Sequence, residues 1–277
     1  MPEIAEVETV KETLKRKILN KKIVSVDIIY PKMIESDIRE FKNIIENKMF
    51  IDIKRIGKWL IFDLGDYYLL SHLRMEGKFF IKDKSLPIIK HEHIIFTFED
   101  GSDLRYHDTR KFGKMNLIEK CDLYEVESIK KQGLEPLDDK LTADYLLEKL
   151  KNKRIAIKTL LLDQTIISGL GNIYVNEILF DARINPKRCG NTITKEECIK
   201  IIHSSKRIIK RAIELGGTTI KSYTSSLGVT GKFQNELKVH TKENEKCPVC
   251  SEKIKRIKIN GRSTYYCEEC QKNEVNF

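Results

Sequence analysis

The sequence lacks any long apolar run. No segment approaches the roughly 20 apolar residues that a membrane-spanning helix needs, and no apolar signal segment opens the chain. A disulfide framework is also lacking, because Cys121, Cys189 and Cys198 are scattered and odd in number outside the C-terminal region. These absences lead us to expect an intracellular, cytoplasmic protein. No internal repeat is evident.

Acidic residues are fewer than basic ones. The 277 residues include 51 Lys and Arg against 41 Asp and Glu, which gives a formal net charge of +10. Such an excess favours a polyanionic partner, with nucleic acid as the leading candidate, although a merely solvated basic surface would give the same count. The length permits two domains with a well-buried core.

The first half of the chain lacks the alternation of strands and helices that marks a parallel sheet. After one N-terminal helix, it consists of short segments rich in β-branched and aromatic residues, with turn signals between them. This pattern predicts an α+β protein with an antiparallel sandwich or barrel. The expected strands are 22–29, 51–56, 59–64, 67–70, 94–98 and 104–107.

The apolar period becomes helical from about residue 138. Thr142 is expected to cap one helix, and Thr194 with Glu197 forms a capping box for a longer one. Gly216-Gly217 ends that helix. The segment 216–235 is rich in Gly, Ser and Thr, and a loop of this length is either a functional lid or a disordered segment.

Four cysteines close the chain in two Cys-x-x-Cys pairs separated by sixteen residues. Between the pairs, Asn260-Gly261 is a strong signal for a hairpin turn, which would bring the pairs together. Four thiolates around one Zn²⁺ leave no open position, so the metal is expected to fold this segment and to take no part in chemistry. Two disulfides or four idle thiols are the alternatives. The expected zinc ligands are Cys247, Cys250, Cys267 and Cys270.

The N-terminus places carboxylates on the side of a helix that should be buried. Glu3 falls inside the apolar stripe of the first helix and Glu6 at its edge. Burying a carboxylate costs free energy, so a functional reason is expected, and the neighbouring Pro2 offers one. Once Met1 is removed, the secondary amine of Pro2, with a pKa near ~8, is more often free at neutral pH than a lysine and can form an iminium. An ordinary acidic first turn behind a proline is the alternative.

Two further constellations suit nucleic acid. Met75, Arg110 and Phe112 lie at expected sheet-end turns and together can form a wedge that enters a base stack, with core packing and a surface ion pair as alternatives. A Gly-x-Gly turn precedes Asn172, which is a good N-cap residue for the next helix. Such a turn lets backbone N–H groups approach an anion, but alone it is a weak signal.

Several separated stretches match, in order, the motifs of one known family. These stretches are Pro2-Glu3, Glu6 to Val10, His72 to Gly77, Arg105-Tyr106, Asp108, Arg110 to Gly113, Leu161 to Glu177, Gly216 to Leu237 and Gly261 to Gln271. Together they resemble the bacterial formamidopyrimidine-DNA glycosylase family over essentially the whole chain.

The resemblance implies a DNA-repair enzyme, a bifunctional DNA glycosylase and apurinic/apyrimidinic lyase. Such an enzyme removes oxidised purines, among them 8-oxoguanine and formamidopyrimidines, and cuts the strand by β,δ-elimination. It also implies a monomer with a β-sandwich catalytic domain (1–130), a helix-two-turn-helix domain with a lesion-capping loop (131–235) and a zinc-finger hairpin (236–277). The implied partner is double-stranded DNA that contains oxidised bases.

The resemblance assigns the catalytic roles. Pro2 is the Schiff-base nucleophile that attacks C1′, Glu3 is the proton donor, and Glu6 is its supporting carboxylate. Lys58 corresponds to the proton donor of β-elimination, although by itself it reads as an exposed strand lysine. Arg262 corresponds to the proton donor of δ-elimination and to a phosphate contact.

The resemblance also assigns contacts to DNA from which the damaged nucleotide has been extruded. Met75, Arg110 and Phe112 fill the vacated space, and the segment 216–235 is the lid over the extruded base. Further DNA contacts are expected from His72, His91, Lys158 and Asn172, with a core or surface position as the alternative for the two histidines.

The sequence departs from the family pattern at two places: the first bears on the N-terminal turn and leaves the nucleophile in place, and the second leaves the preferred lesion open. Ala5 stands where a second proline is usual, and residues 225–230 differ from the usual lid sequence. The nearest alternative is an enzyme of the endonuclease VIII type, which prefers oxidised pyrimidines, but the segment Val7-Glu8-Thr9 and the wedge residues argue against it. The alternative of another class is a non-catalytic zinc-ribbon DNA-binding protein.

Overall fold

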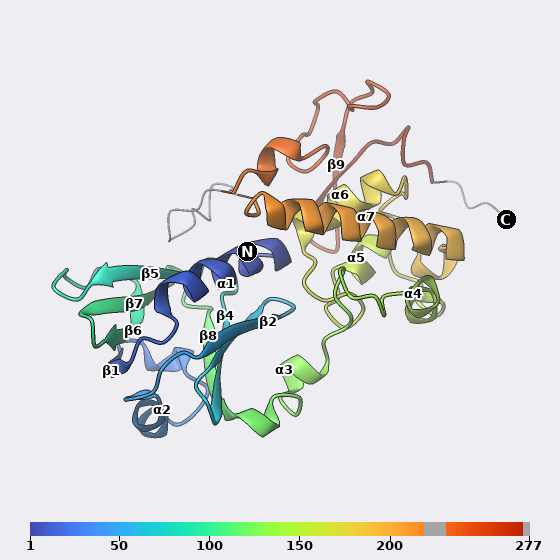
Figure 1. The fold of residues 1–277 in the computed structure, drawn as a ribbon. Helices are drawn as coiled ribbons and strands as arrows, with labels where there is room; N and C mark the ends of the chain where they lie inside the picture. Colours follow the sequence, from blue (N-terminus) through green and yellow to red (C-terminus); the bar gives the residue numbers. More distant parts are fainter. Residues whose placement is uncertain (219–230, 274–277) are drawn as a thin grey trace. The chain divides into compact units, whose positions relative to one another are not determined.

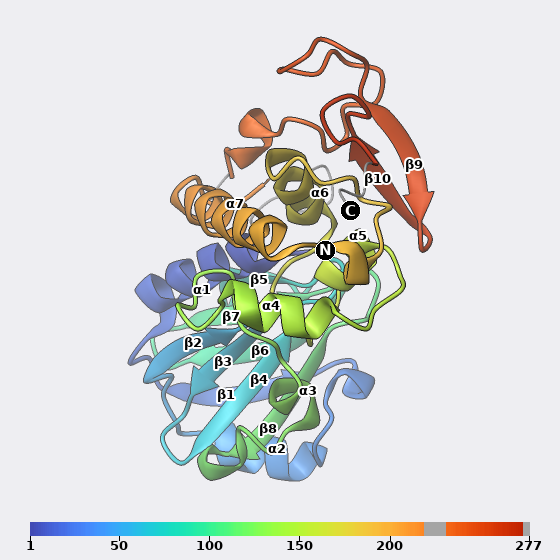
Figure 2. The ribbon, with the colours of Figure 1, turned by 90° about the vertical axis from the view of Figure 1, so that its right-hand side faces the viewer.

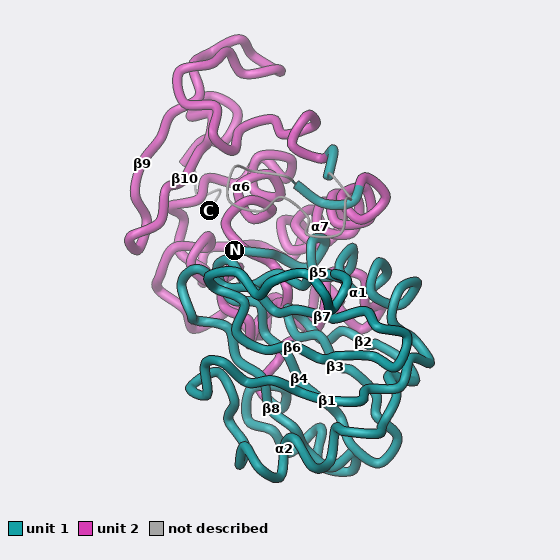
Figure 3. Tube along the Cα trace, turned by 90° about the vertical axis from the view of Figure 1, so that its left-hand side faces the viewer, with its two compact units in different colours: residues 1–130, 216–232 teal, residues 131–215, 233–277 magenta. Residues whose placement is uncertain are grey.

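The computed structural model describes residues 1–218 and 231–273, and the chain divides into two compact units. Unit 1 comprises residues 1–130 and 216–232, and unit 2 comprises residues 131–215 and 233–277 (Figure 3). Among the described residues, no helix is both long enough and apolar enough to cross a membrane.

Unit 1 is built on two four-stranded antiparallel sheets (Figure 1). One sheet has the strand order β1-β6-β7-β5 and the other β2-β3-β4-β8. A single cluster of buried apolar side chains draws on both sheets, which confirms the predicted sandwich. The strands are β1 (Ile23–Ile28), β2 (Asp52–Ile56), β3 (Trp59–Asp63), β4 (Tyr67–His72), β5 (Lys78–Asp83), β6 (Glu92–Phe98), β7 (Ser102–His107) and β8 (Lys114–Glu119).

Two strands and one helix of unit 1 depart from the sequence-based expectation. Strands β5 and β8 were not expected, and the reading of all of 22–118 as strands and turns is wrong at α2 (Ile38–Ile45). The α2 helix forms because the Asp37 side chain caps it, accepting from two backbone N–H groups, and because Phe41 and Ile45 lie one turn apart on its buried side.

Helix α1 (Ile4–Ile18) supplies part of the sandwich core. Its predicted apolar stripe is confirmed, because Val7, Val10 and Leu14 all belong to the buried cluster that the two sheets share. Burying this face fixes where the residues before the helix begin. The remaining short helices of unit 1 are η1 (Pro31–Met33), η2 (Lys120–Asp122) and α3 (Glu127–Lys130).

Unit 2 is helical apart from one hairpin. The expected caps are confirmed: the Thr142 hydroxyl accepts from the backbone of Tyr145, and Thr194 and Glu197 form a capping box. Helices α5 and α6 are joined by a segment of turns, and α4 and α6 both pack against α7. The helices are α4 (Ala143–Leu150), α5 (Ile157–Leu161), α6 (Asn172–Asp181), η3 (Gly190–Thr192), α7 (Lys195–Glu214) and η4 (Phe233–Glu236).

The hairpin of unit 2 consists of β9 (Lys255–Ile259) and β10 (Arg262–Tyr266). Its turn is Asn260-Gly261, as the sequence predicted, and both residues have positive φ (46° and 73°), which suits the twist of a two-residue hairpin. Strand β10 packs against α6 (Figure 2). The hairpin is therefore attached to the helices by its second strand.

Candidate active site

The N-terminal carboxylates are buried, as the helical stripe predicted for Glu3. Only 3% of Glu3 and 5% of Glu6 is exposed, and Pro2 is buried as well. The two glutamates form a capping box at the start of α1, in which the backbone N–H of Glu3 donates to Glu6 Oε2 over 2.9 Å. The capping box fixes the backbone that carries Pro2.

The other carboxylate oxygen of Glu6 holds a distant part of unit 1. Glu6 Oε1 accepts from the backbone N–H of Thr218 (2.7 Å) and from its hydroxyl (3.0 Å). Gly217 has a φ of +76°, and a Cβ there would lie 2.7 Å from Glu6 Oε1, so only glycine fits. Sequence reasoning placed Thr218 in the predicted lid but missed its contact with Glu6, because the two residues are 212 apart in the sequence. The predicted lid (216–235) falls mainly on residues 219–230, which lie outside the described residues.

Burial and nearby charges act on the N-terminal amine. Burial lowers the pKa of the Met1 amine below its ordinary value; Lys58 adds to this effect, and Glu3 and Glu6 oppose it. Lys58 itself is buried, at the turn between β2 and β3, so the alternative of an exposed strand lysine is wrong.

An ion pair holds the turn that carries Lys58 against α1. Arg55 Nε donates to Glu8 Oε2 over 2.7 Å, and another guanidinium nitrogen donates to the carbonyl of Gly57. Burial alone would raise the pKa of Glu8, but hydrogen bonds from Lys11 and Arg55 hold that pKa below its usual value. Glu8 therefore stays ionised and keeps the turn in place.

The three predicted wedge residues lie on two loops of unit 1. Met75 is 37% exposed and Phe112 is 50% exposed, so neither side chain belongs to the core. The exposed guanidinium of Arg110 lies 4.8 Å from the centre of the Phe112 ring. The alternative of core packing for Met75 and Phe112 is therefore wrong.

The buried carboxylate of Asp108 holds the loop of Arg110 and Phe112. Its two oxygens accept from the backbone N–H groups of Arg110 (2.9 Å), Phe112 (2.9 Å) and Gly113 (2.8 Å). A side-chain hydrogen bond between Thr109 and Glu76 ties this loop to the one that carries Met75. The two loops are thus held as one element, although their residues are more than 30 apart in the sequence.

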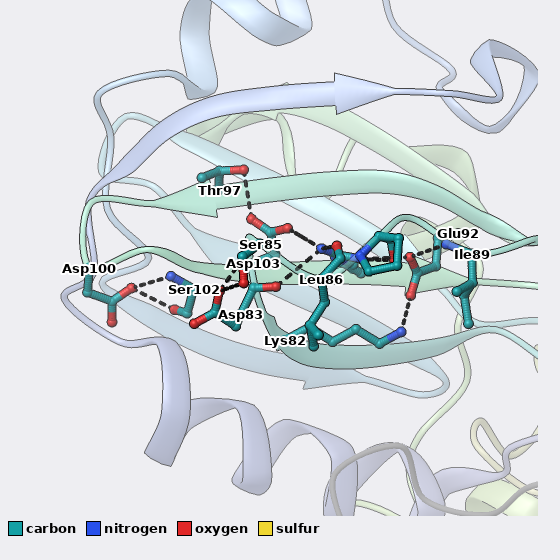
Figure 4. Close-up of polar contacts among 12 residues, drawn as sticks. Lys82, Asp83, Ser85, Leu86, Ile89, Glu92, Thr97, Asp100, Ser102 and Asp103 are labelled. Carbon is teal, nitrogen blue, oxygen red and sulfur yellow. Dashed lines mark hydrogen bonds and ion pairs between the residues drawn. The ribbon is translucent and has the colours of Figure 1, made fainter.

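His91 follows a loop that a buried arginine holds. Figure 4 shows Leu86, Ile89 and Glu92 of this region. The Arg105 guanidinium donates to the carbonyls of Leu86 (2.7 Å) and Pro87 (3.1 Å), and it forms an ion pair with Glu92 (3.0 Å). The carbonyl of His91 in turn accepts from the backbone N–H of Asp108. His91 is partly exposed beside the wedge loop, so it remains a predicted DNA contact.

His72 is placed differently from His91. It is buried, its ring packs edge-on against Trp59 at 4.8 Å, and its Nδ1 accepts from the backbone N–H of Arg74. Burial, together with the charges of Arg74 and Lys58, lowers the pKa of His72 to about 3. His72 is thus neutral at physiological pH and helps to fix the turn before Met75.

In unit 2, Asn172 lies beside the hairpin. The expectation that Asn172 is an N-cap is wrong, because Gly171 takes that position and Asn172 is the first residue of α6. Its side-chain amide donates instead to the carbonyl of Ser263 on β10 over 3.0 Å. The neighbouring residue Arg262 is exposed at the start of β10. The structure thus brings Asn172 and Arg262 together.

Lys158, expected to contact DNA, is fully buried on α5. Its ammonium donates to Asn176 Oδ1 (2.9 Å), the Ser263 carbonyl (2.8 Å) and Thr264 Oγ1 (2.8 Å). Asn176 also contacts His240, whose Nδ1 lies 2.7 Å from Asn176 Nδ2. Burial and the charge of Lys158 lower the pKa of His240 to about 4.

The four C-terminal cysteines form a compact sulfur cluster. All four Sγ atoms lie within 4.8 Å of one another, with Cys247 and Cys270 3.8 Å apart and Cys250 and Cys267 3.4 Å apart. A tetrahedral Zn²⁺ with Zn–S bonds of about 2.3 Å needs sulfur separations of about 3.8 Å, so the cluster fits one structural zinc. All seven cysteines are described and none forms a disulfide, which excludes the disulfide alternative.

The fold and the site define a class of protein. A β-sandwich with a buried proline and two glutamates at its N-terminus is joined in one chain to turn-linked helices and a Cys₄ zinc hairpin. Three family models match these parts in order. The Formamidopyrimidine-DNA glycosylase N-terminal domain matches residues 1–115, the H2TH domain of the same enzyme residues 132–224, and the zinc finger found in FPG and IleRS residues 244–273.

Known proteins match along the whole chain. The formamidopyrimidine-DNA glycosylases of Lactobacillus delbrueckii and Listeria monocytogenes are each 44% identical over 98% of this chain and 100% of their own length. An FPG variant from Lactococcus lactis in complex with Fapy-dG-containing DNA is 40% identical, with a TM-score of 0.94 over 98% of this chain and 100% of that one. The chain belongs to the formamidopyrimidine-DNA glycosylase family.

Proposed function

We propose that this protein is a base-excision repair enzyme, a DNA glycosylase with apurinic/apyrimidinic lyase activity that removes 8-oxoguanine and formamidopyrimidines. The observation that carries the proposal is the buried N-terminus, where Pro2 precedes two nearly inaccessible carboxylates, Glu3 and Glu6. Burying two carboxylates is costly, and a reacting amine beside them gives that burial a purpose.

The chemistry begins once Met1 has been removed. The secondary amine of Pro2 attacks C1′ of the damaged nucleotide; the new N–C1′ bond forms as the bond to the base breaks, and the base leaves with its electron pair and a proton. Glu3 is the proton donor for this step. Glu6 supports it, since its oxygens already hold the backbone of Glu3 and Thr218.

The nitrogen then loses its proton and the C1′–O4′ bond breaks, with its electron pair and a proton going to O4′, so the sugar ring opens and an iminium forms at C1′. Strand cleavage follows from this iminium. The positive nitrogen accepts electrons as a proton leaves C2′ and the 3′ phosphate departs, and a second elimination expels the 5′ phosphate. We assign Lys58 to the first elimination and Arg262 to the second. Lys58 suits its role because its side chain is buried at the β2–β3 turn and its charge acts on the N-terminal residue.

DNA is the partner, and we propose double-stranded DNA that contains an oxidised base. Met75, Arg110 and Phe112 fill the space that the extruded nucleotide leaves, since they are exposed on loops held together by side-chain and backbone hydrogen bonds. The protein acts as a monomer in the cytoplasm, where bacterial DNA lies. Domains 1–130, 131–235 and 236–277 carry catalysis, DNA clamping with lesion capping, and the zinc hairpin.

Intact mass after borohydride trapping tests the proposal. The processed protein is incubated with a duplex that contains 8-oxoguanine, borohydride reduces the iminium, and the mass of the covalent adduct is measured. We expect the mass of the chain without Met1 plus the cleaved DNA sugar. If no adduct forms on this duplex or on abasic DNA, the non-catalytic zinc-ribbon alternative holds.

A lesion panel separates the two enzyme alternatives. A Lactococcus lactis relative has been solved with an oxidised pyrimidine in its DNA, so pyrimidine lesions belong in the panel. We expect faster cutting at 8-oxoguanine and formamidopyrimidine than at thymine glycol. Efficient cutting at thymine glycol with none at 8-oxoguanine would instead support the endonuclease VIII type.

A further inference from the structure

The ammonium of Lys158 is directed at the backbone of one hairpin strand. Lys158 is 0% exposed, and its Nζ donates to the carbonyl of Ser263 and to the hydroxyl of Thr264, both over 2.8 Å. Ser263 and Thr264 are the two residues that follow Arg262 on β10. A charged donor makes stronger hydrogen bonds than a neutral one, so these bonds hold the start of β10 firmly.

Helix α6 also forms a hydrogen bond with the Ser263 carbonyl. The Asn172 amide, at the start of α6, donates to the Ser263 carbonyl over 3.0 Å, so α5 and α6 both bind one peptide group. The carbonyl of Ser263 thus has both of its lone pairs engaged. Arg262 is therefore presented from a backbone that two helices of unit 2 hold in place.

The third bond of Lys158 extends the anchor into α6. Lys158 donates to Asn176 Oδ1, which leaves Asn176 Nδ2 facing His240 Nδ1 at 2.7 Å. Asn176 and His240 are both buried. These two hydrogen bonds fix the orientation of the Asn176 amide. The amide oxygen therefore stays directed at the Lys158 ammonium.

We propose that Lys158 is a positioning residue, which acts on DNA through β10 and Arg262 and makes no phosphate contact of its own. The proposal rests on the proposed function, in which Arg262 contacts a phosphate. It replaces the expectation that Lys158 touches DNA directly, because a fully buried ammonium engaged with three acceptors has no surface to offer a phosphate.

A double-mutant cycle on the salt dependence of binding tests the proposal. Affinity for an uncleavable abasic-analogue duplex is measured between 50 and 200 mM salt for Lys158→Met, for Arg262→Ala and for the double variant. If Lys158 acts through Arg262, each single variant lowers the salt slope by ~1 and the double variant lowers it by no more than Arg262→Ala alone. A decrease of ~2 in the double variant means a separate phosphate contact by Lys158 and overturns the proposal.

A second measurement needs no DNA and so separates this proposal from the proposed function. Backbone amide hydrogen exchange is followed in the free, zinc-loaded protein. We expect exchange in β10 to rise about tenfold or more in Lys158→Met, because charge-assisted hydrogen bonds are lost. Unchanged exchange overturns the anchor. If Arg262→Ala binds as the unaltered protein does, the phosphate contact of the proposed function fails while the exchange result still stands.

Two further variants guard against loss of folding and against a simple charge effect. Thr264→Val removes one acceptor of the Lys158 ammonium with little change in volume, and we expect a smaller rise in β10 exchange in the same direction. Lys195→Met removes an exposed lysine of the same unit, which is paired with Asp144, and we expect no change in slope or exchange. A Thr264→Val variant with unchanged exchange would contradict the anchor even if Lys158→Met does not fold.

Discussion

The two units hold the exposed groups that we propose contact DNA by different means. In unit 1, the loop of Arg110 and Phe112 is held by hydrogen bonds from three backbone N–H groups to the carboxylate of Asp108. In unit 2, Arg262 lies on the hairpin of β9 and β10. One pair of zinc-ligating cysteines precedes β9 and the other pair follows β10. The first arrangement depends on the polypeptide alone, and the second depends on a metal ion as well.

This difference indicates that the chemical reaction and DNA binding can be altered separately in one chain. The buried proline and glutamates are completed within unit 1 by residues up to Thr218. The hairpin is completed within unit 2 by α5, α6 and the cysteine cluster. Changes at the N-terminus of unit 1 should therefore alter base removal, and changes at the hairpin of unit 2 should alter DNA binding.

The largest effect is expected from blocking the amine of Pro2. A chain that keeps Met1, or carries a short N-terminal extension, has no free secondary amine, so we expect complete loss of the borohydride-trapped adduct while DNA binding persists. Electrophoresis of trapped complexes and a separate binding titration measure the two properties. An adduct formed in undiminished yield, mapped by peptide mass to another residue, would contradict the assignment.

Glu3→Gln should slow base excision by about 10²–10⁴-fold, because it removes a positioned proton donor. Cleavage of DNA with a preformed abasic site should suffer less, since no base has to leave. Single-turnover rates on the two substrates give the comparison. Glu12→Gln is the matched control, because Glu12 lies on the same helix and its side chain is 46% exposed. Equal rates in Glu3→Gln and the control would remove Glu3 from the mechanism.

Zinc removal should weaken DNA binding on the order of 100-fold, because a structural zinc site contributes its binding energy to the folding of the hairpin. Trapping at saturating abasic DNA should still yield an adduct, since Pro2 belongs to unit 1. Fluorescence anisotropy before and after chelation, and again after Zn²⁺ is restored, measures the effect. Loss of trapping even at saturating DNA would show that the two regions are not separable.

Unit 1 should lose about 2 kcal/mol of stability between pH 7 and pH 5 through His72. The unfolded chain binds a proton at this histidine below about pH 6.5, whereas the folded chain does so only near its pKa of about 3, so acid favours unfolding. Trp59, the one tryptophan, lies beside His72 and reports urea unfolding of this unit. In His72→Gln the pH dependence should shrink by that amount, and an undiminished dependence would assign it to other groups.

Arg262→Ala should have the smallest effect, a decrease of ~1 in the salt slope if Arg262 makes one phosphate contact. This corresponds to a change of roughly three- to four-fold in relative affinity between 50 and 200 mM salt. Single-turnover excision at saturating DNA should change little, because the proton donor to the base lies in unit 1. An unaltered slope would assign Arg262 to the hairpin structure alone.

The sequence predicted the parts of the fold that depend on local signals. The Asn260-Gly261 turn, the Thr194 capping box and the cysteine pairs each act over a few residues, and all three are confirmed. The buried side of α1 followed from helical period alone. Membership of the family followed from motif order, which the relatives confirm.

The sequence could not predict groups that are brought together over long separations. Thr218 meets Glu6 across 212 residues, and Lys158 meets Ser263 across 105, and neither pairing leaves a local signal. Burial of a charged side chain could not be predicted either. Lys158 matches a family motif and was expected to contact DNA, but the structure shows that it is fully buried. Strand β5 was missed because charged residues flank its short apolar centre.

The contact between Gly217 and Glu6 has a practical consequence for handling the protein. The first residues of the chain are buried. The Glu6 carboxylate accepts hydrogen bonds both from Glu3, just before α1, and from Thr218, after α7. Affinity tags and fusion partners placed before Pro2 would consume the reacting nitrogen and crowd a space where even one methyl group at Gly217 does not fit. Purification and imaging labels therefore belong at the opposite end of the gene.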